Sequence, residues 1–63
     1  MDLGKNIAKA RKNANMTQEQ LAEKLQVARQ TVSKWEAGTT MPTVPGLMKL
    51  AEALETDCNS LLA

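Results

Sequence analysis

Four hydrogen-bonding side chains lie close together in residues 27–36 of this chain: Arg29, Gln30, Ser33 and Lys34. At about 100° per residue, an α-helix places all four on one side of its cylinder. The opposite side then holds three apolar residues, Ala28, Val32 and Trp35. A β-strand would not separate the two groups, because alternate residues would mix them on each face. The pattern therefore predicts a helix that packs through Ala28, Val32 and Trp35 and presents the four polar side chains outward.

The chain has little of what enzymatic chemistry needs. It contains no His, no Tyr and one Cys, so neither a Cys/His zinc set nor a Ser–His or Cys–His nucleophile pair can form. Its three glycines do not form a phosphate-binding loop. We expect no enzyme activity, no cofactor, no metal site and no small-molecule substrate. Cys58 is interpreted as a small buried apolar residue.

Length and charge further limit the kinds of protein to which this chain can belong. The 63 residues suffice for one small domain, residues 1–63, and hold neither a membrane span nor a secretory signal. A single cysteine cannot form an internal disulfide, which fits the cytoplasm. Residues 1–34 carry seven bases and three acids, a charge of +4, whereas residues 35–63 carry one base and four acids, a charge of −3. This asymmetry suggests a first half that faces something anionic.

Helical periodicity runs through the whole chain. A first helix has an inward stripe of Leu3, Ile7, Ala10 and Ala14 and directs Lys5, Lys9 and Lys12 to solvent. A second begins at Thr17, with a Thr17–Gln20 capping box and with Leu21, Ala22 and Leu25 inward. After the third helix, Gly38 is expected at the C-terminal cap.

The remaining residues predict a loop and two more helices. The stretch TTMPTVP is expected to be a loop, with Pro45 suited to the first turn of the helix that follows. That helix has an apolar stripe of Leu47, Leu50, Ala51 and Leu54. Asp57 can cap a last short helix that carries Cys58, Leu61 and Leu62. The prediction is a compact all-α bundle of five helices.

Three stretches resemble the helix-turn-helix domain of phage repressors and Cro proteins, the Xre-like family. They are MTQEQLAEKLQVARQTVSKWEAG, PTVPGLMKLAEAL and the terminal DCNSLL, and the resemblance covers residues 3–62. It implies a repressor-type five-helix fold with the motif at about residues 17–36. It also implies that the recognition helix, about residues 28–36, enters the DNA major groove. The expected function is sequence-specific binding of a double-stranded DNA operator by a repressor-like transcriptional regulator.

The resemblance assigns roles to individual residues. Arg29 can donate twice to guanine and Gln30 can pair with adenine, while Lys34 can reach guanine or phosphate. With Ser33 these form the expected base-contacting set. The residues expected at the DNA backbone are Thr17, Gln18, Thr39, Thr40 and Arg11. Arg11 and Glu36 match a pair that the family uses as a largely buried salt bridge.

The sequence departs from the family at turns. Gln26 and Glu55 occupy positions where glycine is frequent, and Ala28 replaces a common Ser or Thr cap. A left-handed backbone at Gln26 and the lost cap at Ala28 are each expected to cost on the order of 1 kcal/mol.

The expected assembly is a homodimer on DNA in the cytoplasm of a bacterial or phage-infected cell, with Leu61, Leu62 and Met41 as candidate dimer contacts. Two alternatives remain open on the same fold. One is an antitoxin-like protein that binds a toxin as well as DNA, and the other is a protein-interaction module that has lost DNA binding.

Overall fold

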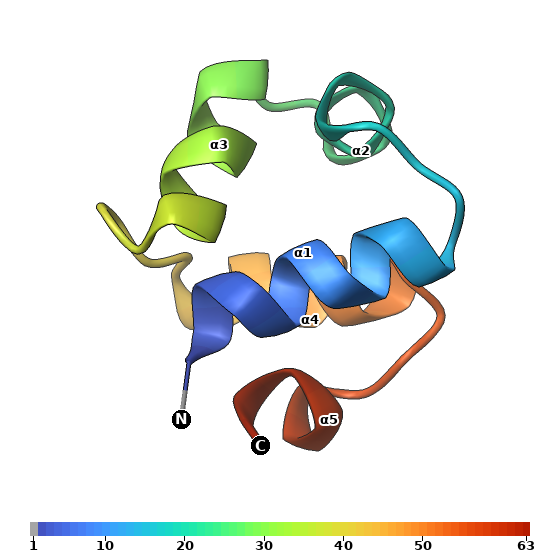
Figure 1. Ribbon diagram of the computed structural model, residues 1–63, viewed down its shortest axis with the longest axis vertical. Helices are drawn as coiled ribbons and strands as arrows, with labels where there is room; N and C mark the ends of the chain where they lie inside the picture. The colour runs from blue at the N-terminus through green and yellow to red at the C-terminus, as the bar shows by residue number, and fades with distance from the viewer. Residues whose placement is uncertain (1) are drawn as a thin grey trace.

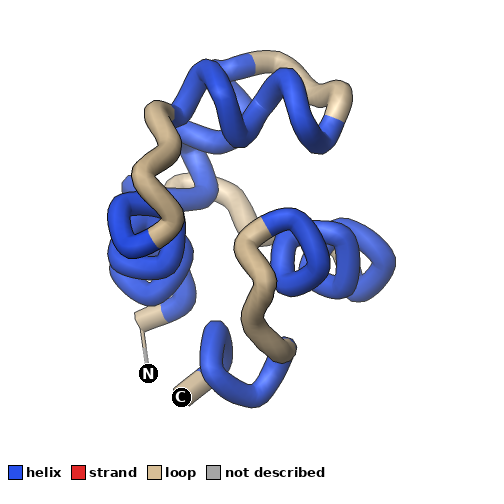
Figure 2. The backbone as a smooth tube through the Cα atoms, turned by 90° about the vertical axis from the view of Figure 1, so that its right-hand side faces the viewer, coloured by secondary structure: helices blue, strands red, loops and turns tan. Residues whose placement is uncertain are grey.

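The computed structural model describes residues 2–63, and this part of the chain contains five α-helices and no strand (Figures 1 and 2). The helices are α1 (Leu3–Asn13), α2 (Gln18–Leu25), α3 (Arg29–Ala37), α4 (Val44–Ala53) and α5 (Cys58–Leu62). α3 packs against α1 and α2, α5 packs against α1 and α4, and α2 packs against α4. The all-α, five-helix prediction is confirmed.

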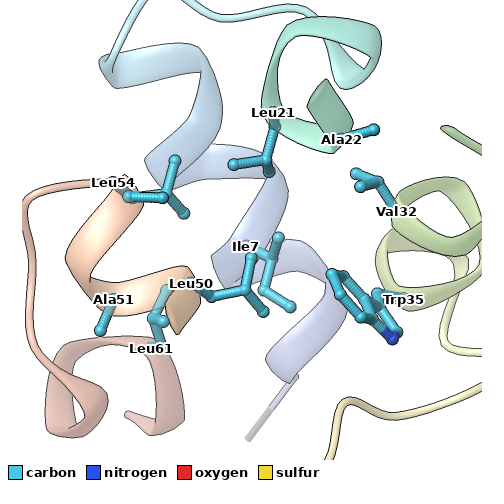
Figure 3. Packing of buried hydrophobic residues seen from close by; sticks show 10 residues of the cluster. Ile7, Leu21, Ala22, Val32, Trp35, Leu50, Ala51, Leu54 and Leu61 are labelled. Carbon is cyan, nitrogen blue, oxygen red and sulfur yellow. The ribbon is translucent and has the colours of Figure 1, made fainter. Parts of the chain in front are cut away.

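Each helix contributes one fully buried side chain to a common core. These side chains are Ile7, Leu21, Val32, Leu50 and Leu61, each no more than 1% exposed, and they converge in Figure 3. Smaller or partly buried apolar residues surround them, including the rest of the predicted inward stripes of α1, α2 and α4. The spacing of apolar residues therefore predicted the inner face of these helices correctly.

Local signals at the helix ends also operate as expected. The Thr17 hydroxyl accepts from the backbone N–H of Gln20, and the Gln20 side chain accepts from the N–H of Thr17, which completes the capping box. Gly38 ends α3 in a left-handed conformation, at φ 79°. Asp57 caps α5 by accepting from the N–H of Ser60.

Four expectations need correction. Ala28 is exposed rather than packed, because it is the extended N-cap residue before α3 begins at Arg29. Leu61 is 1% exposed and belongs to the core, so it cannot serve as a dimer contact. Cys58 is only partly buried and packs against the edge of the core. The predicted loop ends at Thr43, since α4 already begins at Val44 and holds Pro45 in its first turn.

Among residues 2–63, no helix has the length and apolar character needed to cross a membrane. The described residues also bring together no group of three or more His, Cys, Asp or Glu side chains that could hold a metal ion.

Candidate functional site

The outer face of α3 presents the polar side chains that the helical wheel grouped together. Arg29, Gln30 and Lys34 are exposed, whereas Ser33 is half-buried. On the inner face, Val32 is fully buried and Trp35 is 9% exposed, and both point into the core in Figure 3. The core thus fixes the rotation of α3 about its axis, and the long polar side chains project together because of it.

The start of α2 lies beside the start of α3. Thr17 is exposed and its hydroxyl is occupied by the capping box, while Gln18 is the first residue of α2 and is half-buried. The Gln18 side-chain oxygen accepts a hydrogen bond from Arg29 Nη1 at 3.4 Å. Side chains from the N-terminal ends of α2 and α3 therefore lie within reach of each other, next to the partial positive charge that each helix dipole places at its N-terminus.

A largely buried ion pair lies behind this surface. Arg11 Nε donates to Glu36 Oε2 at 2.7 Å and Arg11 Nη2 donates to Oε1 at 3.1 Å, a bidentate arrangement. The two side chains are 11% and 8% exposed. Arg11 Nη1 also donates to the carbonyl oxygen of Met16 at 2.7 Å, so the pair ties α1 and the α1–α2 turn to α3. The structure thus brings together the two residues that the resemblance pairs.

Glu36 receives a third hydrogen bond, from Gln18 Nε2 to Oε1 at 3.0 Å. Burial raises the pKa of Glu36, but the hydrogen bonds from Arg11 and Gln18, together with the charges of Arg11 and Lys12, outweigh burial and leave this pKa below its ordinary value. Glu36 is therefore a carboxylate at neutral pH. Both of its oxygens accept hydrogen bonds from side chains of α1 and α2.

The loop after α3 carries the two threonines expected at a DNA backbone. Thr39 and Thr40 are exposed, and their backbone N–H groups donate to the carbonyl oxygen of Lys34 at 2.9 and 3.4 Å. These bonds continue the last turn of α3 through Gly38 into the loop. The threonine side chains lie at the C-terminal end of α3, at the far end from Arg29.

Sequence reasoning missed part of this arrangement. The family resemblance places Gln18 at the DNA backbone alone, yet its amide bridges Glu36 and Arg29. Contacts between residues 11 or 18 positions apart leave no trace in helical periodicity. The available signal was that Gln18 begins one helix and Arg29 begins the next, which places their side chains within reach across a short turn.

Comparison with known proteins places the chain in a family. A family model described as "Helix-turn-helix" matches residues 7–61. The chain belongs to this helix-turn-helix family. The family predicted from the sequence is thereby confirmed, and the motif of α2 and α3 is its namesake element.

Three similar proteins illustrate the match. The HTH-type transcriptional activator BcrR of Enterococcus faecalis is 35% identical over all 63 residues, which correspond to 31% of its length. The cryptic phage CTXphi transcriptional repressor RstR of Vibrio cholerae is 34% identical over 97% of this chain and 54% of its own. The chain thus spans about a third to about half of the length of these curated relatives. A similar solved structure is the crystal structure of SinR, the master regulator for biofilm formation, in complex with DNA. The SinR chain has 31% sequence identity with this chain and a TM-score of 0.89, and the match covers 97% of this chain and 98% of the SinR chain.

Proposed function

We propose that this chain is a sequence-specific, double-stranded DNA-binding domain of a repressor-like transcriptional regulator. The observation that carries the proposal is the exposed face of α3, where Arg29, Gln30 and Lys34 project together above the buried Val32 and Trp35. The names of the relatives support it, since these proteins are transcriptional regulators and the SinR structure was solved with DNA.

The side chains of this face match what base edges offer in the major groove. The groove is about 12 Å wide, which admits a helix, and guanine presents two acceptors there while adenine presents one donor and one acceptor. Arg29 supplies two donors for guanine and Gln30 supplies the complementary pair for adenine. Lys34 lies about one turn further along α3 and reaches a guanine or a phosphate, with Ser33 beside it at the edge of the face.

The residues around α3 are proposed to hold the DNA backbone. Thr17 and Gln18 lie at the N-terminus of α2, where free N–H groups and the helix dipole favour phosphate. Thr39 and Thr40 provide neutral hydroxyl groups at the other end of α3. Arg11, whose guanidinium is engaged by Glu36 and Met16, is proposed to act mainly through the structure of the site.

The proposed assembly is a homodimer on DNA, in the cytoplasm, with half-sites about 34 Å apart. A single domain offers few base contacts, so two copies are needed for a specific interface. Met41 is 73% exposed and Leu62 is 37% exposed, and both line a shallow groove of about 250 Å³ beside Trp35. These two residues remain the proposed dimer contacts, while the buried Leu61 does not.

A random-site selection tests the proposal directly. Double-stranded DNA with a randomised segment is selected by the wild-type chain and by the Arg29→Ala and Gln30→Ala variants in parallel. We expect the wild type to enrich one motif and each variant to lose preference at one position, by about 1–3 kcal/mol per base pair. Lys49→Ala, which removes an exposed charge from α4, is the matched control and should retain the full motif. Enrichment of no motif by the folded wild type, at any salt concentration, would refute the proposal.

A further inference from the structure

The Gln18 amide joins two groups of opposite hydrogen-bonding character. Its Nε2 donates to Glu36 Oε1 at 3.0 Å, and its Oε1 accepts from Arg29 Nη1 at 3.4 Å. Glu36 is 8% exposed and held by Arg11, whereas Arg29 is exposed on the outer face of the site. Gln18 therefore connects the buried ion pair with the surface residue at the start of α3.

Both neighbours require the same orientation of the amide. A carboxylate only accepts hydrogen bonds and a guanidinium only donates them, so the Gln18 NH₂ group must face Glu36 and its oxygen must face Arg29. The opposite orientation would set two acceptors against each other at Glu36 and two donors against each other at Arg29. The orientation of Gln18 is thus fixed twice, once from the core side and once from the surface side.

The inner end of this connection is rigid. Glu36 lies on α3 and accepts two hydrogen bonds from Arg11, which also donates to the Met16 carbonyl oxygen. Gln18 donates its hydrogen bond to this carboxylate, whose position is held by Arg11. An arginine side chain otherwise populates many rotamers, and it must give up this freedom when it binds a base edge. A partner that limits its rotamers beforehand reduces that loss.

We propose that Gln18 is a positioning residue, which holds the guanidinium of Arg29 in place before DNA arrives, with its own orientation set by the Glu36 carboxylate. The proposal rests on the proposed DNA-binding function. It extends that function because the preference for one base pair then depends on a residue of α2 as well as on the recognition helix. A Gln18 that contacts phosphate alone would affect all DNA sequences equally.

A double-mutant cycle separates these two roles. Affinities for the selected site, and for the same site changed at the base pair where Arg29→Ala loses preference, are measured for wild type, Gln18→Met, Arg29→Ala and the double variant. Any loss of DNA affinity that Gln18→Met causes equally in the presence of Arg29 and in the Arg29→Ala variant is attributed to a phosphate contact. We expect Gln18→Met to cause a further loss of affinity of about 3- to 10-fold only when Arg29 is present. This further loss should be seen for the selected site and should disappear when that one base pair is changed. A coupling below about threefold, or a loss spread evenly over sequences, would overturn the proposal.

The matched control is Gln20→Met, which also removes a side-chain hydrogen bond at the start of α2 but does not touch α3. It should show no coupling with Arg29. Unfolding curves establish that each variant is folded at the temperature of the binding measurement. If Gln18→Met is not, Gln18→Asn takes its place, because it keeps a polar residue at the start of α2 and lacks the reach to bridge both partners.

A measurement without DNA completes the test. The order of the Arg29 side chain on the picosecond-to-nanosecond timescale is read from the relaxation of its ¹⁵Nε–H group in the free protein. It should fall in Gln18→Met and stay at the wild-type level in Gln20→Met, and equal mobility in all three proteins would overturn the proposal. A wild type that selects no DNA sequence would refute the proposed function, whereas one that selects a motif without the coupling would refute only the role of Gln18.

Discussion

Gly4 lies directly against the carbonyl oxygens at the end of α3. A Cβ atom built on Gly4 would stand 2.6 Å from the carbonyl oxygens of both Trp35 and Glu36. Real Cβ atoms do not approach backbone oxygen so closely, and backbone cannot swing aside as the end of a side chain can. The first turn of α1 therefore packs on the last turn of α3 with no room for a side chain. This contact sets the distance of α3 from α1.

Gly4→Ala is expected to destabilise the protein by forcing α1 and α3 apart. Over-packing of this kind lowers the free energy of unfolding by about 1–3 kcal/mol, and the better helix propensity of alanine offsets up to about 1 kcal/mol of this loss. The melting temperature should fall by several degrees, since about 1 kcal/mol corresponds to about 4–8 °C in a domain of this size. Thermal unfolding followed by circular dichroism measures the change.

Gly46→Ala is the matched control for Gly4. Its Cβ atom would lie 3.3 Å from the Thr43 hydroxyl oxygen, which caps α4 by accepting from the Gly46 N–H, and 3.5 Å from Pro42 Cβ. Only Thr43 would have to shift slightly, and no backbone oxygen stands in the way. The melting temperature of Gly46→Ala should stay within a few degrees of the wild type. If Gly4→Ala melted at the same temperature as Gly46→Ala, a methyl group would fit between Gly4 and the end of α3, which contradicts the close contact described above.

Glu36→Ala should be among the most destabilising single substitutions in the site. It leaves the Arg11 guanidinium charged, 11% exposed and without its carboxylate partner. Loss of one member of a buried pair costs about 3–5 kcal/mol, and we expect the lower end because some exposure remains. Urea unfolding of Glu36→Ala and of the exposed-site control Glu23→Ala measures this difference. An unchanged midpoint for Glu36→Ala would contradict the structural role of the pair.

Stability should fall in acid through the same carboxylate. The pKa of Glu36 in the folded protein lies below the ordinary value of 4.5, because the hydrogen bonds from Arg11 and Gln18 outweigh the opposing effect of burial. A lowered folded-state pKa contributes stability that is fully present above about 4.5 and is lost as the pH falls through the folded-state value. Asp57, whose pKa is lowered by hydrogen bonds from Ser60, acts in the same direction.

Melting temperatures measured from pH 7 down to pH 3 test this dependence. The wild type should melt at a nearly constant temperature down to about pH 5 and then at falling temperatures. Glu36→Gln, which is less stable at neutral pH, should show a shallower decline because it has one fewer carboxylate with a lowered pKa. Parallel curves for the two proteins would show that Glu36 does not contribute to the acid sensitivity.

The features that depend on the local pattern of residues could be predicted from the sequence. Helical spacing identified the inward stripes of α1, α2 and α4, and the capping box followed from Thr17 and Gln20. The wheel angles of α3 placed Arg29, Gln30 and Lys34 outward correctly, whereas Ser33, which they also placed outward, is half-buried. The Arg11–Glu36 pair came from the family resemblance, because the two residues are 25 positions apart. The family model and the fold confirm the class of protein, while the base and backbone contacts remain predictions.

The remaining features depend on how the helices meet. Helical periodicity predicts that Ala28 packs inward, but the chain is still extended at that residue, so its side chain does not reach the inner face of α3. Leu61 and Leu62 are adjacent on a five-residue helix, and only packing against α1 and α4 decides that Leu61 turns inward. Similarly, the Lys24 ammonium group donates to the carbonyl oxygen of Ala53 at 3.1 Å and so binds α2 to the end of α4. No spacing within one helix encodes such contacts.

The left-handed turn at Gln26 offers a way to stabilise the motif. Gln26 ends α2 at φ 58°, where a side chain is strained and glycine is not. Gln26→Gly should therefore raise the free energy of unfolding by up to about 1 kcal/mol, measured by urea unfolding. Asn15 has a similar φ of 59°, but asparagine tolerates this region, so Asn15→Gly is the control and should change stability less. A lower unfolding midpoint for Gln26→Gly would show that the Gln26 side chain contributes more than its backbone strain removes.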